Sequence, residues 1–326
     1  MVDSTRQASS QPPALRFRVA GRQDLTATLN VINQSFRVAV DEAAWEWYLY
    51  GNPYGATRVY LGVEPVAETP VAVFAFTPAP LRVRGKMVAA SSGHHLCLTP
   101  EYRGGGPFIK LSQYALKHEA ELGVKLALGL PNRKSHAPQV MLIKWTDLFW
   151  MDCFFKLSPA ARTHTCRMID DFGAEFDRFY TRVAGTLAFC VEKNSAWMNW
   201  RFCSRPGGVY TVWAVERGGE LSGYAVLKRW LEPDGYAKAH IVDFHALDED
   251  SASHLLNAAE SYSTGCDELN LWVAPGYPYR AILEARGFAP RVEAQQPLIV
   301  KALGGAAFPS QVEPASFSYA DGDFVY

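Results

Sequence analysis

A glycine-rich turn in the first half of the chain has the residue types that bind a diphosphate. The segment LCLTPEYRGGGPF, residues 96–108, runs from a strand-like stretch into a helix that we expect to begin at Pro107. Glycines let backbone N–H groups approach an anion closely, and the N-terminus of the helix adds partial positive charge. Proline suits the first helical position, where its missing N–H is not needed. The pattern predicts a pyrophosphate site at residues 103–108.

The context of this turn argues against two other phosphate-binding motifs. A P-loop requires Lys and then Ser or Thr after its glycines, whereas Gly106 is followed by Pro107 and Phe108. A dinucleotide-binding turn follows the first strand of a βαβ unit. Here the turn follows several strand-like runs that connect as hairpins.

The segment resembles the acyl-CoA signature of the GNAT acetyltransferase superfamily, R/Q-x-x-G-x-G/A. Arg103 takes the first position and Gly106 the fourth, and Phe108 stands where the family usually has Gly or Ala. Some branches with R-G-x-G-hydrophobic-Phe resemble this chain more closely. The likeness covers residues 15–150, including the run Gly129-Leu130-Pro131-Asn132.

This resemblance implies that the chain uses an acyl-CoA, with acetyl-CoA as the expected co-substrate. Main-chain groups of the strand before the turn would pair with the pantetheine arm, where two neighbouring strands splay apart. The cofactor-binding residues that it implies are Leu96, Cys97, Leu98, Arg103, Gly104, Gly105, Gly106, Pro107, Phe108 and Asn132.

Acyl transfer to an amine needs a base for the amine proton and donors for the oxyanion. His94 and His95 lie on the strand that leads into the turn, and alternation predicts that only one of them faces the cleft. Either is a candidate base or water-relay partner, or a structural histidine. Glu101 and Asn132 are further catalytic candidates. Alternatively, Glu101 is an exposed turn residue and Asn132 is a turn former after Pro131.

The usual acid of the family is a Tyr on the helix that follows the fifth strand, and this chain has none there. Residues 133–141 read RKSHAPQVM, in which His136 is the possible substitute. Cys97 could serve as a nucleophile, but a position on a buried strand favours an inert thiol.

Around these residues the chain predicts a β-α-α-β-β-β-α-β-α order. Strands are expected at 15–20, 59–64, 71–76, 81–98 with a turn at 84–86, and 124–130. Helices are expected at 24–36, 42–50, 107–122 and 139–144. The fold class is therefore α/β in the layered, α+β sense: a mixed, mostly antiparallel and splayed sheet flanked by helices.

The second half repeats the pattern of the first. Trp47–Pro53 matches Trp200–Pro206, and the strand at 71–76 matches 221–226. The shared order of these matches predicts a tandem duplication. We expect a tail at 1–13, a CoA-binding domain at 14–160, a degenerate domain at 161–302 and a C-terminal tail at 303–326.

The second copy lacks the glycines of the first. Residues 245–250, HALDED, separate its equivalent strand and helix, and acidic side chains there would repel a pyrophosphate. We expect this copy to help shape the acceptor site. The aromatic tail residues Phe317, Tyr319, Phe324 and Tyr326 are expected to cover the site and exclude water.

Composition limits the remaining possibilities. The formal net charge of −1 gives no global field for nucleic acid, and no apolar run is long enough to span a bilayer. The six cysteines form no C-x-x-C pair, which argues against a disulfide framework and a structural zinc site. The start of the chain has no apolar signal region, so a cytoplasmic protein is expected.

The sequence thus favours an acyl-CoA-dependent N-acyltransferase, expected to be an N-acetyltransferase. Its expected partner is a small-molecule amine or amino sugar, with no nucleic acid, no membrane and no metal, in a monomer or homodimer. Two alternatives stay open: a non-catalytic module that binds an acyl-CoA or a glycan, and an aminoacyl transferase that uses charged tRNA. The glycine-rich turn at residues 103–108, the expected cradle for the pyrophosphate, and the near-zero net charge disfavour the aminoacyl transferase that uses charged tRNA.

Overall fold

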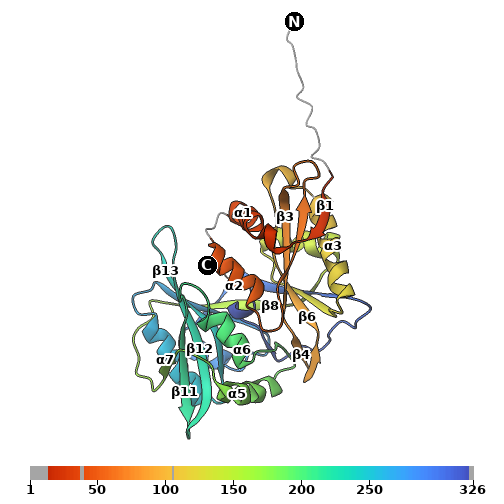
Figure 1. The fold of residues 1–326 in the computed structure, drawn as a ribbon. Coiled ribbons are helices and arrows are strands. Elements are labelled where there is room, and N and C mark those ends of the chain that lie inside the picture. Colours follow the sequence, from red (N-terminus) through yellow and green to blue (C-terminus); the bar gives the residue numbers. More distant parts are fainter. Residues whose placement is uncertain (1–13, 37–39, 105, 323–326) are drawn as a thin grey trace.

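The computed structural model describes residues 14–36, 40–104 and 106–322, and it shows two α/β halves built on one long sheet (Figure 1). The helices are α1 (Leu25–Phe36), α2 (Glu42–Tyr50), α3 (Gly106–Glu121), α4 (Arg133–Ile143), α5 (Ala174–Gly185), α6 (Ser195–Met198), α7 (Glu249–Tyr262) and α8 (Arg280–Ala285). Short turns of other helix types are η1 (Arg22–Asp24), η2 (Pro100–Tyr102), η3 (Asn199–Cys203) and η4 (Tyr319–Asp321).

The strands of the first half are β1 (Arg16–Val19), β2 (Arg58–Val63), β3 (Pro70–Pro78), β4 (Leu81–Val83), β5 (Lys86–Val88), β6 (Ala90–Leu98), β7 (Leu126–Gly129) and β8 (Thr146–Leu157). Those of the second half are β9 (Arg167–Ile169), β10 (Phe189–Val191), β11 (Thr211–Arg217), β12 (Glu220–Leu231), β13 (Ala237–Ala246), β14 (Glu268–Val273), β15 (Ala289–Ala302) and β16 (Ala315–Ser316).

The order in the long sheet is β1-β2-β3-β6-β7-β15-β8-β14-β13-β12-β11-β9. In the first half, α1 and α2 cover one face, where they pack on Val73, Ala75 and Cys97. Helix α3 covers the other face, packing on Ala72, Phe74 and Leu98. This alternation along β3 and β6 is what a sheet buried on both faces requires.

The last strands of the two halves are exchanged. Strand β8 follows the first half along the chain but pairs with β14 of the second. Strand β15 follows the second half but pairs with β7 of the first, and β8 and β15 pair with each other at the centre. The sheet is therefore continuous through both halves.

The duplication predicted from sequence is visible as a pseudo-twofold arrangement. Trp47 and Trp200, matched in the repeat, stack with ring centroids 5.3 Å apart. Each indole N–H donates to the other's backbone carbonyl, Trp47 to Trp200 at 3.0 Å and Trp200 to Trp47 at 3.3 Å. Equivalent residues therefore meet across the junction, as expected near a local symmetry axis.

Most elements around the site agree with the sequence predictions to within two residues. Helix α2 has the predicted bounds, and α3 begins one residue before Pro107. Helix α4 is longer than predicted because Asn132 caps it, so that it begins at Arg133, six residues before the expected start at 139. The 12-residue strand β8 is absent from the predicted order.

Candidate acyl-CoA site

Strands β6 and β7 separate at one point and leave a gap between them. They pair in parallel only from Ala90 to Gly93 on β6 and from Leu126 to Gly129 on β7. Beyond Gly93, β6 continues alongside β3 alone. A cavity of about 280 Å³ opens there, lined by residues 93–96 of β6 and by residues 129–132 at and after the end of β7. The predicted splay is thus present, and it holds a partly apolar cavity that a ligand arm could enter.

The glycine turn lies at the far end of the same strand. Gly104 has φ +129°, a conformation that favours glycine, and Gly106 begins α3 and donates to the Gly104 carbonyl at 2.7 Å. A Cβ at Gly104 or Gly106 would meet no atom within 4 Å, so both positions are open to a ligand. Gly105 lies outside the described residues.

Other residues of the turn have defined local roles. The Arg103 side chain bends back and donates through Nε to the Leu98 carbonyl at 3.1 Å. Phe108 is half-buried against the core beneath α3, so its ring packs on the first half. Pro107 occupies the first turn of the helix, as predicted.

A buried carboxylate fixes α3 on the sheet. Glu119 accepts two hydrogen bonds from the Arg58 guanidinium, each at 2.5 Å, one from Tyr60 at 2.6 Å and one from Ser91 at 2.7 Å. Paired carboxylate–guanidinium contacts of this geometry are strong and directional. The N-terminus of α3 is therefore held in a set orientation relative to β6.

Both histidines of β6 face the same side of the sheet, so the alternation prediction was wrong. His95 has φ +53° and lies in a bulge, where His95 and Leu96 oppose the single residue Phe74. The rings of His94 and His95 lie 6.2 and 5.5 Å from the ring of Tyr48 in α2. Both histidines line the cavity.

The other predicted site residues divide between the cavity and its surroundings. Asn132 lines the cavity, and its side-chain oxygen caps α4 by accepting from the N–H groups of Lys134 and Ser135, both at 3.0 Å. Any ligand contact would therefore come from its amide nitrogen. Glu101 is exposed in η2 and is not among the lining residues.

The strand residues before the turn point in different directions. Leu96 lines the cavity, whereas Cys97 packs in the core under α1 and Leu98 in the core under α3. Burial raises the pKa of the Cys97 thiol to about 12, so it is an inert thiol rather than a nucleophile. His136, the possible substitute acid, contacts Asp147 at 2.6 Å and does not line the cavity.

Several residues of the site were not predicted. Ser135 and Gln139 enter from α4, Phe74 and Trp145 form part of the wall, and Gln296 comes from β15. Ser135 follows the cap residue Asn132 by one helical turn, a spacing that could have been read from the sequence. Gln296 could not have been found, because it reaches the site through the strand exchange.

The corresponding gap in the second half is filled by the chain itself. Strands β13 and β14 pair in parallel only over three residues, Lys238–His240 with Glu268–Asn270. Beyond them the tail lies alongside β13: Ser316 contacts His245 at 3.0 Å and Ser318 donates to Asp243 at 2.9 Å. Only about 10 Å³ of cavity remains there.

This tail placement corrects the expectation that its aromatic residues cover the cofactor site. Phe317 stacks on Phe189 at 5.4 Å, and Tyr319 lies 4.4 Å from the Trp272 ring, both within the second half. Phe324 and Tyr326 lie outside the described residues. The plugged gap and the acidic first turn of α7 leave the second half without a cradle among the described residues.

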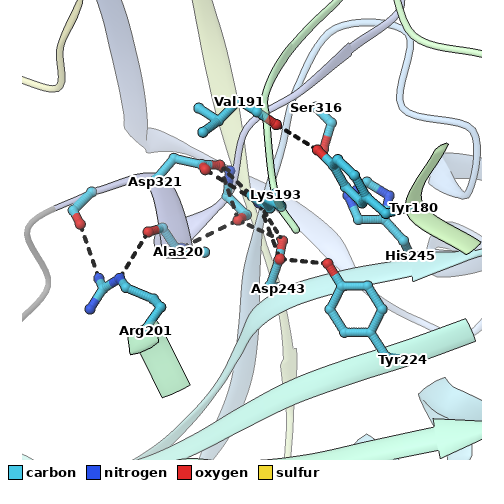
Figure 2. A network of polar contacts seen from close by, with 12 residues as sticks. Tyr180, Val191, Lys193, Arg201, Tyr224, Asp243, His245, Ser316, Ala320 and Asp321 are labelled. Atoms are coloured by element: carbon cyan, nitrogen blue, oxygen red, sulfur yellow. Dashed lines mark hydrogen bonds and ion pairs between the residues drawn. The ribbon is translucent and has the colours of Figure 1, made fainter. Parts of the chain in front are cut away.

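A buried ionic network holds the tail in place (Figure 2). Lys193 donates to both oxygens of Asp243 at 3.1 Å and forms an ion pair with Asp321 at 3.2 Å. Arg201 donates to the carbonyls of Ala320 at 3.2 Å and Gly322 at 3.1 Å. Burial lowers the pKa of His245, beside Asp243, to about 4.

The tail also reaches the junction between the halves. A cavity of about 30 Å³ is lined by Tyr48 and His94 from the first half and by Trp200, Arg201 and Asp321 from the second half and tail. His94 therefore lines both this cavity and the gap between β6 and β7. No helix in the described part of the chain has the length and apolar character of a membrane span.

Comparison with known proteins supports the fold but gives no close relative. No protein-family model matches the sequence, and no curated protein matches it. Among solved structures, a GCN5-related N-acetyltransferase from Anabaena variabilis matches with a TM-score of 0.68 at 15% identity, over 88% of this chain and 73% of that one. An Enterococcus faecalis protein described as a probable N-acyltransferase matches with a TM-score of 0.67 at 14% identity, over 89% and 73%.

The fold is also similar to that of an N-myristoyltransferase. Saccharomyces cerevisiae N-myristoyltransferase with bound myristoyl-CoA matches with a TM-score of 0.64 at 12% identity, over 91% of this chain and 86% of that one. At these identities the likeness shows the fold: a mixed α/β, tandem GNAT architecture that extends over both halves of the chain.

Proposed function

We propose that this protein is an acyl-CoA-dependent N-acyltransferase with acetyl-CoA as its co-substrate. The observation that carries the proposal is the alignment of three features on β6: the open glycine turn, the gap beyond Gly93 and the bulge at His95. The diphosphate would lie at Gly104–Gly106, where N–H groups and the α3 N-terminus favour an anion. The pantetheine arm would lie in the gap, against the edge of β6 that β7 leaves.

In this arrangement the bulge would bring two candidate catalytic groups beside the thioester. His95 is the proposed base for the acceptor amine, with His94 as a second or relaying base, since both line the cavity. The amine nitrogen forms a bond to the thioester carbon, its proton passes to the histidine, and the C–S bond breaks to release CoA thiolate. Peptide N–H groups of β6 beyond Gly93 would stabilise the oxyanion formed in between.

The acceptor would enter from the junction between the halves. His94 lines both cavities, but the junction cavity of about 30 Å³ has room for little more than a water molecule, so the acceptor amine would bind on the junction side of the gap, beside the His94 ring. A small-molecule amine or amino sugar fits this proposal better than a charged tRNA, because a net charge of −1 gives no field to attract nucleic acid. The alternative of a module that binds acyl-CoA without transferring it shares the same cradle.

Calorimetric titration with acetyl-CoA tests the binding part of the proposal. Gly106→Asp places a carboxylate against the diphosphate and should weaken binding at least tenfold. Gly185→Asp is the matched control, since a Cβ there also meets no atom within 4 Å, but the residue ends α5. Equal affinities of the parent and the folded Gly106→Asp variant would contradict the assignment.

Release of CoA thiol in the presence of a panel of primary amines separates an enzyme from a binding module. An enzyme should release thiol only with an accepted amine, and His95→Gln should lower turnover while leaving acetyl-CoA binding near the parent value. Binding without amine-dependent release across the panel would favour the module.

A further inference from the structure

The end of the gap where β6 and β7 come together is closed by two aromatic rings. Phe74 on β3 is 2% exposed and Trp145 after α4 is 3% exposed, and both line the cavity. A Cβ at Gly93 would meet the Phe74 ring at 3.0 Å, and one at Gly129 would meet Ile299 at 3.1 Å and Trp145 at 3.6 Å. The two glycines therefore mark the point where the cavity meets these rings.

The rings are fixed parts of the first-half core. Phe74 packs with its centroid 4.5 Å from that of Phe76, on the face covered by α3. Trp145 follows Lys144, which ends α4 in a left-handed conformation, and the backbone N–H of Trp145 donates to the Gln139 carbonyl at 3.2 Å. Close-packed cores do not open readily for an added group, because every displaced atom strains its neighbours.

The direction of a bound thioester follows from the position of the cradle. The glycine turn lies beyond the C-terminal end of β6, and the strands meet at Gly93, nearer its N-terminal end. A CoA with its diphosphate at the turn and its arm in the gap therefore directs its acyl group toward Gly93 and Gly129. Each carbon added to the acyl chain advances it toward the two rings.

We propose that Phe74 and Trp145 are specificity-determining residues that limit the site to short acyl chains, of the acetyl class rather than the fatty class. This inference rests on the proposed use of an acyl-CoA. The cavity of about 280 Å³ must also hold part of the pantetheine arm. A fatty chain would have to displace the rings or leave the gap toward α1, where Phe36 is 41% exposed and the chain would meet water.

Titration with CoA, acetyl-CoA, octanoyl-CoA and myristoyl-CoA tests this inference without knowledge of the acceptor. The parent should bind the two long thioesters no more tightly than acetyl-CoA. In Phe74→Ala, room beside Gly93 should let the affinity rise by about fourfold for each of the first methylenes that the new space buries. Phe74→Leu, which removes less volume, should show the same trend more weakly and guards against loss of folding in the alanine variant.

Phe179→Ala is the matched control, because it removes the same side chain, 2% exposed like Phe74, from the core of the second half, away from the cavity lining. It should keep the chain-length profile of the parent. Either of two results would overturn the chain-length inference and leave the proposed function intact. One is a parent that binds myristoyl-CoA at least tenfold more tightly than acetyl-CoA, and the other is a parent-like chain-length profile in both Phe74 variants. A parent that binds none of these thioesters, nor CoA itself, would overturn the proposed function and the inference with it.

Discussion

At the scale of single residues, the second half buries the imidazole of His245, and burial disfavours its protonation. His245 is 5% exposed, contacts Ser316 at 3.0 Å and lies in the network of Lys193 and Asp243. Burial is the main cause of its low pKa, about 4, and the positive charge of Lys193 adds to it, while Asp243 acts in the opposite direction. The neutral ring is therefore the form that the folded protein accepts.

This pKa predicts a pH dependence of stability. Below about pH 6.5 the unfolded chain binds a proton at His245 that the folded chain does not bind until about pH 4, so stability falls as the pH falls through this window. Protonation of His245 in the unfolded chain should therefore lower the free energy of unfolding by about 2 kcal/mol between pH 7 and pH 5. In urea unfolding followed at several pH values, the parent should lose this much relative to His245→Gln. A constant difference between the two proteins over this range would contradict the prediction.

The residue scale is also where sequence reasoning was least complete. The types of His94, His95 and Asn132 indicated the site, and all three line the cavity. Their orientations depended on a bulge at His95 and a helix cap at Asn132. A bulge adds one residue to one strand, and nothing in the local sequence around His94 and His95 marks where that residue lies.

At the scale of elements, the tail is the piece that distinguishes the two halves. Strand β16 pairs with β10, and the following residues fill the gap beside β13. The sequence predicted that an aromatic tail must cover an apolar surface, but it could not say which of two related gaps would receive it. Polar partners favour the second gap: Ser316 and Ser318 meet His245 and Asp243, and no such histidine–aspartate pair is among the described residues that line the first gap.

The tail is therefore expected to contribute to stability and not to cofactor binding. Phe317 is 3% exposed and packs between Phe189 and Phe149, so Phe317→Ala should lower the free energy of unfolding by about 3 to 5 kcal/mol. The affinity for acetyl-CoA should remain within a fewfold of the parent value. Phe308→Ala, in the same tail but at a side chain 41% exposed, should change neither quantity by much. A large loss of affinity in folded Phe317→Ala would show instead that the tail acts on the site of the first half.

At the scale of the whole molecule, the strand exchange joins the two halves into one unit. The sequence revealed the duplication through the Trp47 and Trp200 segments, yet it placed a boundary at residue 160. Local patterns cannot show the exchange, since β8 and β15 each come last in their own half along the chain and only their pairing places them in the other half. The exchange has a direct effect on the site, because Gln296 of β15 lines the cavity and donates to the Pro131 carbonyl at 3.0 Å.

The exchange predicts that residues 14–160 do not form a stable, functional domain alone. This fragment would lack Leu298, Ile299 and Val300 of β15, each at most 1% exposed, and the backbone of β7 would lose one of its two partner strands. Burial of three such side chains is worth several kcal/mol, comparable with the whole stability of a domain. The unpaired edge of β7 and the unpartnered β8 would in addition favour aggregation.

Expression of the fragment alone and together with residues 161–326 measures this dependence. Alone, the fragment should be insoluble or show no cooperative thermal transition, and it should not bind acetyl-CoA. Co-expression should yield a soluble complex of the two pieces with one acetyl-CoA site, since β15 can then pair with β7 and the second gap stays filled by the tail. A fragment that melts cooperatively as a monomer and binds acetyl-CoA would show that the first half completes its own sheet, by turning β8 back to the position that β15 holds in the full chain.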